Sequence, residues 1–197
     1  YKSEKKWDMM INKLNLANSL VYDTDNTTTP LYWYYGLAYF NKGESDIAFD
    51  YFKKAYNINP YHLHVINNLA TCYGLRNNLD KSKELYEKCI AITPRFEEAG
   101  LNLSSIYSYE DRNEEALDIL LGIRNFRLDN ELDLSNNYMQ YFNIILSKYL
   151  EQDVDDFDVT NKNTILATDK VLFLNQLKKI NVLRSEGLDF ETIIKKI

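Results

Sequence analysis

Two prolines, Pro60 and Pro94, end two consecutive segments whose residues match in type, position by position. Small residues fall on small ones, and aromatic residues fall on aromatic ones. The first copy places Gly36, Tyr39, Gly43, Ala48, Phe52 and Ala55 where the second places Ala70, Tyr73, Asn77, Ser82, Tyr86 and Cys89. A third copy, without a proline, follows with Ser104, Tyr107, Asp111, Ala116, Leu120 and Ile123. A period of about 34 residues with this pattern predicts a helical repeat.

Each repeat is expected to be a pair of antiparallel helices, which gives an all-α fold. Helices approach closely only where small side chains meet, so we expect Gly36 to lie opposite Ala48, and likewise in the next copies. The repeated tyrosines should pack within a pair, and Phe52, Tyr86 and Leu120 should face the next pair. A proline ends a helix because it cannot continue the hydrogen-bond ladder. The predicted pairs are residues 31–41 with 45–58, 64–75 with 79–92, and 97–109 with 113–125.

Composition narrows the possible functions. The chain has 45% apolar residues, three prolines and six glycines, as a mostly helical protein would. Its net charge is −6 and it has no block of lysine and arginine longer than a pair, which argues against nucleic acid and anionic membranes as partners. No run of about 18 apolar residues occurs, so no membrane span is predicted. Cys72 and Cys89 are expected to be buried and reduced.

We expect residues 1–197 to form a single solenoid domain with three parts. Residues 1–28 are a partial N-terminal repeat helix and a loop, and residues 29–130 are three repeats. Residues 131–197 are expected to form a degenerate fourth repeat with capping helices, because end repeats meet water on one face. Within this part we predict helices at 132–150, 164–185 and 190–197 around an acidic loop. A chain that opens on Tyr1 in helical periodicity suggests a longer parent protein.

The sequence offers little support for catalysis or for a bound metal. His62 and His64 could belong to a metal site, but no further ligand is placed by spacing, and a structural role or plain exposure is the simpler interpretation. The acidic segment 151–158 fails the pattern of an EF-hand and is expected to be a solvated loop. No phosphate loop, nucleophile motif or zinc motif occurs. We therefore expect no metal, no cofactor and no enzyme activity in this chain.

Over residues 29–130 the chain resembles the tetratricopeptide repeat family. That resemblance implies a right-handed α-solenoid superhelix whose first helices line a concave groove for a protein or peptide. The corresponding groove residues are Trp33, Tyr34, Leu37, Asn67, Asn68, Thr71, Asn102 and Ser105. Asn68 and Asn102 occupy equivalent positions of consecutive repeats, like the asparagines that hold a ligand backbone in other members. The alternative is that they are solvated polar residues on an exposed face.

The groove positions carry no clamp of lysine and arginine. The partner is therefore expected to be neutral or basic and extended, since a carboxylate needs charge-assisted donors. Separately, residues 59–73 resemble the repeat tails of O-antigen ligase or polymerase-like envelope proteins of Bacteroides-type bacteria. This second resemblance implies a soluble periplasmic or cytoplasmic tail of a membrane enzyme, with a glycan as a further possible partner. The sequence leaves the compartment open.

Overall fold

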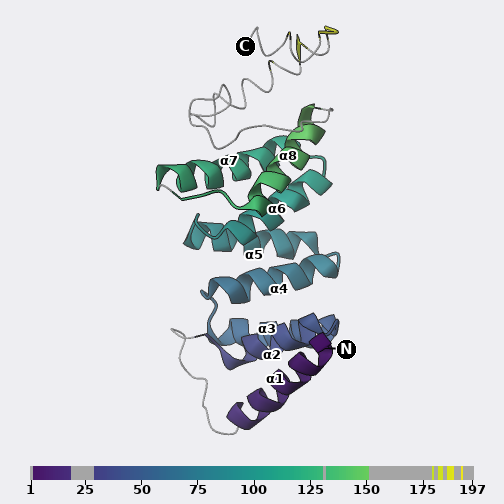
Figure 1. Cartoon of the computed structure of the whole chain (residues 1–197), viewed down its shortest axis with the longest axis vertical. Coiled ribbons are helices and arrows are strands. Elements are labelled where there is room, and N and C mark those ends of the chain that lie inside the picture. The colour runs from purple at the N-terminus through teal and green to yellow at the C-terminus, as the bar shows by residue number, and fades with distance from the viewer. Residues whose placement is uncertain are drawn as a thin grey trace. The chain divides into compact units, whose positions relative to one another are not determined.

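The computed structural model describes residues 2–18, 29–130 and 132–150, with a few positions between 179 and 192. All regular elements in the three long ranges are α-helices, so the all-α prediction is confirmed for them (Figure 1). The helices are α1 (Lys2–Asn18), α2 (Leu31–Asn41), α3 (Ser45–Ile58), α4 (Leu63–Leu75), α5 (Leu79–Ile92), α6 (Glu97–Tyr109), α7 (Asn113–Asp129) and α8 (Asn136–Leu150). The chain divides into two compact units, Tyr1–Thr93 and Pro94–Ile197.

The three predicted helix pairs are confirmed, with small shifts at two boundaries. Helix α4 begins one residue early, at Leu63, and α7 runs to Asp129 instead of residue 125. No proline interrupts α7 at the repeat position, so its hydrogen-bond ladder continues. Helix α8 begins at Asn136 rather than at residue 132, because the Ser135 hydroxyl accepts a hydrogen bond from the Tyr138 amide at 3.0 Å. The loop predicted before residue 29, and the predictions for residues 151–178 and 190–197, fall largely outside the described residues.

The turn within each pair uses the same backbone conformation. Gly43, Asn77 and Asp111, at equivalent positions of the three repeats, have positive φ angles of 83°, 56° and 58°. Glycine and asparagine tolerate this left-handed conformation, as the sequence predicted, and aspartate tolerates it as well. In each turn the next amide bonds back to a repeated tyrosine carbonyl; the bonds are Glu44 to Tyr39 at 2.9 Å, Asn78 to Tyr73 at 3.0 Å and Arg112 to Tyr107 at 2.8 Å. This is the Schellman motif, and it ends each first helix.

Unit 1 packs α2 against α3 and α4 against α5, with α1 against α2 (Figure 1). A Cβ atom at Gly36 would lie 2.4 Å from Cε1 of Phe52, so the Phe52 ring fills the space beside this glycine. The predicted crossing of Gly36 with Ala48 stays a prediction. The Phe52 ring reaches the glycine across its own pair, whereas the sequence led us to expect that it would face the next pair.

The other predicted contacts in unit 1 have mixed outcomes. The crossing of Ala70 with Ser82 is confirmed, since the Ser82 hydroxyl donates to the Ala70 carbonyl at 2.8 Å. Tyr39 packs within its pair as expected, stacked on Tyr51 with ring centroids 5.4 Å apart. Two further aromatic positions differ from the prediction: Tyr73 meets Phe49 of α3, in the preceding pair, and Tyr86 places its hydroxyl 2.9 Å from Thr71, in its own pair.

Unit 2 has its own hydrophobic core, built from α6, α7 and α8. Its fully buried side chains include Leu117, Leu120, Leu121, Tyr138, Phe142, Ile145 and Leu146. The Tyr138 hydroxyl donates to the Leu120 carbonyl at 2.8 Å, which satisfies its polar group inside the core. Gly100 is the close approach here, because a Cβ atom at this position would lie 2.3 Å from Cδ1 of Ile123. The sequence pattern did not reveal that role.

His62 has a structural role at the start of α4, and His64 is exposed. His62 is the N-cap residue, and its Nδ1 accepts from the Val65 amide at 3.4 Å. Its Nε2 lies 2.9 Å from the Thr29 hydroxyl, so the capping tautomer carries its proton on Nε2. The ring centroids of His62 and His64 lie 5.9 Å apart. Among the described residues, no three His, Cys, Asp or Glu side chains are grouped to hold a metal.

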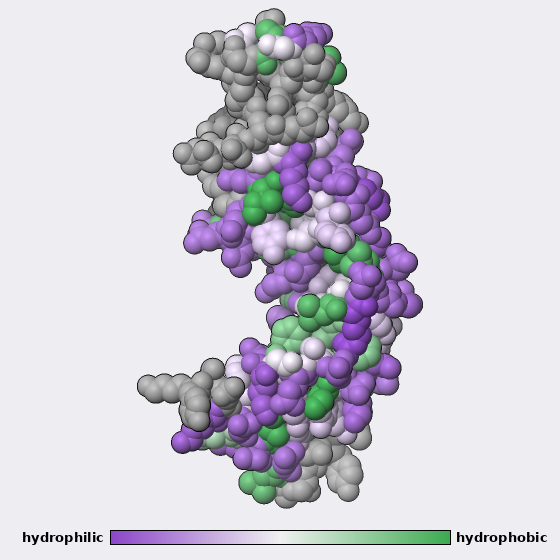
Figure 2. Space-filling view, turned by 90° about the vertical axis from the view of Figure 1, so that its right-hand side faces the viewer, coloured by the Kyte–Doolittle hydropathy of each residue, from purple (hydrophilic) through white to green (hydrophobic). Residues whose placement is uncertain are grey.

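The surface of the described residues is mixed in polarity. Figure 2 shows hydrophobic side chains reaching the surface in separate patches among hydrophilic ones. No helix in the described ranges is long and apolar enough to cross a membrane.

Replacing Gly36 by alanine tests the close approach in unit 1. Phe52 is fully buried and cannot move aside, so we expect Gly36→Ala to lower the free energy of unfolding by about 1–2 kcal/mol. Gly122 is the matched control, because it lies on an exposed face of α7 and a Cβ atom there would have no neighbour within 4 Å. Gly122→Ala should raise stability by about 0.5–1 kcal/mol. Equal changes in the free energy of unfolding for the two variants, measured by chemical denaturation, would contradict the close contact of Gly36 with Phe52.

The cysteines should be slow to react in the folded protein. Both are free and buried, which confirms the sequence prediction. Burial raises the pKa of the Cys72 thiol to about 11 and that of Cys89 to about 12. Ellman's reagent at about pH 8 should therefore modify neither thiol quickly, and should modify both once denaturant is added. Rapid labelling of the native protein would show that the two thiols are accessible to solvent.

Stability should fall as the pH drops below about 6.5. Burial, and then the neighbouring His64, lowers the pKa of His62 in the folded state. The unfolded chain therefore binds a proton at His62 more readily than the folded chain does. The contribution of His62 to the free energy of unfolding is complete above the unfolded pKa and is lost as the pH falls below it. His62→Asn keeps a capping side chain without the titration. Denaturation at about pH 7 and pH 5 should show a smaller loss for the variant; an equal loss would exclude His62 as the cause.

Candidate functional site

Trp33 and Asn68 form the centre of the predicted site in unit 1. The Trp33 indole Nε1 donates a hydrogen bond of 2.8 Å to Oδ1 of Asn68. Trp33 lies on α2 and Asn68 on α4, so this bond joins the first helices of two consecutive pairs. Both side chains are half-buried. The predicted groove positions are thus in direct contact here.

This hydrogen bond fixes the orientation of the Asn68 amide. An indole nitrogen can only donate, so the atom that it meets must be the amide oxygen. The Nδ2 group of Asn68 then carries two N–H donors, and none of the described residues accepts from them. Asn68 can therefore offer a donor to a partner while its acceptor is held by Trp33.

Aromatic rings surround this pair. Trp33 meets the edge of Tyr34 with ring centroids 5.0 Å apart, and it lies 6.0 Å from His62 and 5.9 Å from His64. Tyr34 is 38% exposed and His64 is also exposed, so two rings of the cluster are accessible to solvent. The histidines were not among the predicted site residues. Their positions after Pro60, at the start of a first helix, were the available signal.

The other predicted residues of unit 1 differ in their availability. Leu37 and Asn67 are half-buried on α2 and α4. The Thr71 hydroxyl donates to the Asn67 carbonyl at 2.9 Å and lies 2.9 Å from the Tyr86 hydroxyl. The hydroxyl hydrogen of Thr71 and one of its oxygen lone pairs are thus already engaged within the α4–α5 pair. A contact from Thr71 to a partner stays a prediction.

In unit 2 the predicted residues lie on α6. Asn102 is half-buried, and the Ser105 hydroxyl donates to the Leu101 carbonyl at 3.0 Å. Ser105 also lines a hollow of about 350 Å³ between α6 and α8. The other lining residues are Ser108, Gln140, Tyr141, Ile144, Ile145 and Lys148. The hollow combines an apolar wall with one ammonium group, which lies 3.2 Å from the Ser108 hydroxyl.

The predicted groove residues include none on α8, although a degenerate fourth repeat was predicted in this part of the chain. Tyr141 stands one repeat period after Tyr107, and Asn136 stands one period after Asn102. This register identifies α8 as the first helix of a further repeat and adds an exposed asparagine to the predicted series. The change of a small residue to Tyr138 at the crossing position obscured the match.

Comparison with known proteins locates the repeats. The family model for the tetratricopeptide repeat matches residues 29–62 and 63–96. The uncharacterized protein ycf37 of Pyropia yezoensis is 31% identical over 78 residues, which are 40% of this chain and 44% of that protein. The chain therefore spans less than half the length of this relative. Neither finding concerns an O-antigen ligase, so that resemblance, with its bacterial envelope setting, stays a prediction.

Two solved structures share the fold. The first tetratricopeptide domain of Spaghetti (RPAP3), bound to the HSP90 peptide SRMEEVD, has a TM-score of 0.53 at 16% identity and covers 61% of this chain and 94% of its own. The Sgt2 tetratricopeptide domain of Aspergillus fumigatus has a TM-score of 0.54 at 17% identity, and the match covers 68% of this chain and 90% of that domain. The α-solenoid class is thereby confirmed. The chain contains tetratricopeptide repeats, at residues 29–62 and 63–96.

Proposed function

We propose that this chain is a non-catalytic module that binds an extended protein segment along its first helices. The observation that carries the proposal is the orientation of the Asn68 amide by Trp33. An extended segment exposes a backbone carbonyl at every residue, and a fixed N–H donor can bind one of them whatever the side chains are. The rings of Trp33 and Tyr34 supply apolar contact area beside that donor.

Asn102 is proposed to repeat this role in unit 2. It stands one repeat period after Asn68, on the next first helix of the chain, and Ser105 lies one turn further along. The hollow beside Ser105 could accept an apolar side chain of the segment against Tyr141 and Ile144. Leu37, Asn67 and Thr71 complete the proposed contact set.

The charge of the face favours a neutral or basic segment. The proposed residues of unit 1 carry no formal charge, and the whole chain carries −6. The structural neighbour binds an HSP90 peptide, SRMEEVD, with three acidic residues. A peptide of that kind needs charge-assisted donors to offset the desolvation of its carboxylates. Among the residues that line the hollow in unit 2, Lys148 is the one such donor, and Glu98 on α6 is exposed and opposes an anion.

Calorimetry with the peptide SRMEEVD tests the predicted exclusion of acidic ligands. We expect a Kd no tighter than about 1 mM, because one lysine cannot replace a clamp of several cations. Micromolar affinity that is lost in the double variant Asn68→Ala with Asn102→Ala would show that the peptide binds at the proposed residues, and that the predicted preference for neutral or basic segments is wrong.

A display library of short, unstructured peptides tests the face itself. Neutral or basic sequences should be enriched, and the Asn68→Ala variant should bind the selected peptides about tenfold more weakly, the loss of one well-placed hydrogen bond. Asn57→Ala is the matched control, since Asn57 is exposed on the second helix α3. Equal loss in both variants, or none in either, would contradict the proposal.

A further inference from the structure

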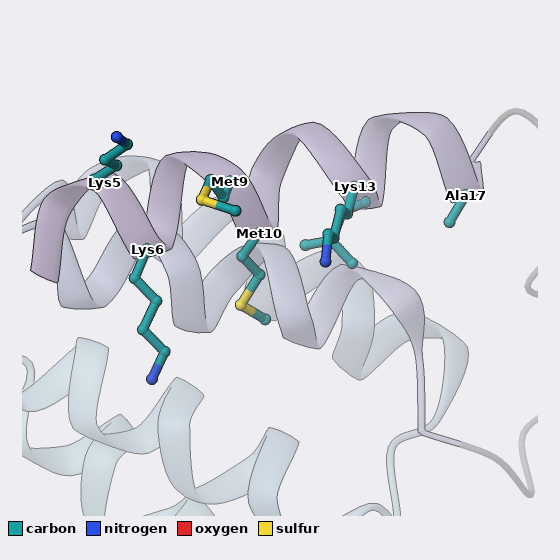
Figure 3. Close-up of a pocket in the computed structure, with 7 residues that line it drawn as sticks. Lys5, Lys6, Met9, Met10, Lys13 and Ala17 are labelled. Atoms are coloured by element: carbon teal, nitrogen blue, oxygen red, sulfur yellow. The ribbon is translucent and has the colours of Figure 1, made fainter.

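The hollow of unit 2 lies between two first helices that share one core. Helices α6 and α8 contact each other, and both contribute buried side chains to the core of unit 2 (Figure 1). A larger hollow, of about 760 Å³, occurs on α1, but its lining residues all belong to that single helix (Figure 3). The hollow between α6 and α8 has a volume of about 350 Å³. Ligand sites span about 300–1,000 Å³, so a hollow of this size suits one large side chain.

The wall of this hollow on α8 is apolar and partly open to solvent. Tyr141 is half-buried, Ile144 is 50% exposed, and Ile145 is buried in the core. A side chain placed against these three residues would remove apolar surface from water, which is favourable. The wall therefore favours a ligand group with a large apolar part.

The Lys148 ammonium brings hydrogen-bond donors to the same hollow. The Ser108 hydroxyl donates to Oδ1 of Asn113 at 2.9 Å, so its oxygen can only accept from Lys148. Nζ of Lys148 donates to that oxygen at 3.2 Å. A lysine ammonium has three N–H donors, and none of the described carboxylates pairs with this one. The remaining donors of Lys148 can therefore bind an acceptor on a ligand.

Ser105 adds an acceptor one turn before Ser108 on α6. Its hydroxyl hydrogen is used on the Leu101 carbonyl at 3.0 Å, so its oxygen keeps a lone pair for a ligand. The hollow thus combines an apolar wall with a charged donor and a neutral acceptor.

These groups match a phenol better than other large side chains. An aliphatic or phenylalanine side chain would cover the ammonium and hydroxyl groups without bonding to them, which is unfavourable. Lysine and arginine are repelled by Lys148, and tryptophan has no acceptor for it. Aspartate and glutamate would place little apolar surface on the wall. Tyrosine has a large ring and a hydroxyl that can accept from Lys148 and donate to Ser105.

We propose that this hollow binds a tyrosine side chain of the extended segment. Its ring packs on Tyr141 and Ile144, and its hydroxyl accepts a hydrogen bond from Lys148. The inference rests on the proposed function, because it names the residue that the segment inserts in unit 2. A tyrosine is neutral and so agrees with the predicted preference for neutral or basic segments.

The peptide library tests this assignment with the full 197-residue chain. Peptides flanked on both sides by carrier sequence have no terminal carboxylate for Lys148, and those selected should be enriched in tyrosine at one position. In calorimetry with a selected peptide, amidated at its C-terminus, phenylalanine in place of that tyrosine should weaken binding about tenfold, as for a lost hydrogen bond to a charged group. Lys148→Met should abolish this difference between the two peptides. Lys53→Met, at an exposed position of the second helix α3, should preserve it.

Two small molecules test the hollow without any segment. p-Cresol and toluene are the side-chain analogues of tyrosine and phenylalanine. In NMR titrations, p-cresol should shift the signals of Ser105 and Ile144 at concentrations at which toluene does not. Lys148→Met, with the circular dichroism of the parent chain, should respond equally to both. Equal shifts by the two molecules in the parent chain, or no shifts by either, would overturn the assignment.

The results separate this inference from the proposed function. If selected peptides bind and lose affinity in Asn68→Ala, but show no preference for tyrosine over phenylalanine, the proposed function holds and the tyrosine assignment is wrong. A preference for tyrosine that persists in Lys148→Met would also overturn the assignment to this hollow. If no library peptide binds, the proposed function fails and the tyrosine of the segment fails with it, whatever p-cresol does.

Discussion

The helix pairs depend on one left-handed residue that recurs two positions after each first helix. At Gly43, Asn77 and Asp111 the positive φ angle turns the chain, and the following amide bonds back to a tyrosine carbonyl. The motif satisfies carbonyl groups that the helix end would otherwise leave without partners. Because the turn is short, the second helix must return along the first. In unit 1 the regular spacing then brings the first helix α4 to a place equivalent to that of α2.

This regular spacing explains why Trp33 and Asn68, 35 residues apart, can share a hydrogen bond. The turn residues and the loop after each second helix determine where α4 lies beside α2. The bond then fixes the amide of Asn68 and leaves its N–H group as the available donor. The same arrangement gathers Tyr34 and the two histidines around Trp33. A surface with one oriented donor among aromatic rings is thus a consequence of the repeat.

Periodic residues made most of the helical architecture predictable, because turns and crossings repeat at a fixed interval. The predictions failed where a particular side chain solved a local packing problem. Gly36 is small because the Phe52 ring needs its space, and Gly100 because Ile123 does, whereas Ser82 bonds to a carbonyl at its crossing. The site residues of unit 1 were found by analogy of position. The donor role of Asn68 could not be predicted, since it depends on the orientation of one indole.

Solution NMR of the Trp33 indole N–H tests the central claim, that this hydrogen bond orients the site. The chain has two tryptophans, so the Trp7 signal serves as an internal reference. The bond predicts that the Trp33 indole proton exchanges with water slowly, and that Asn68→Ala accelerates the exchange and shifts the signal while Asn57→Ala does neither. A Trp33 signal that exchanges as fast in the parent chain as in Asn68→Ala would contradict the account.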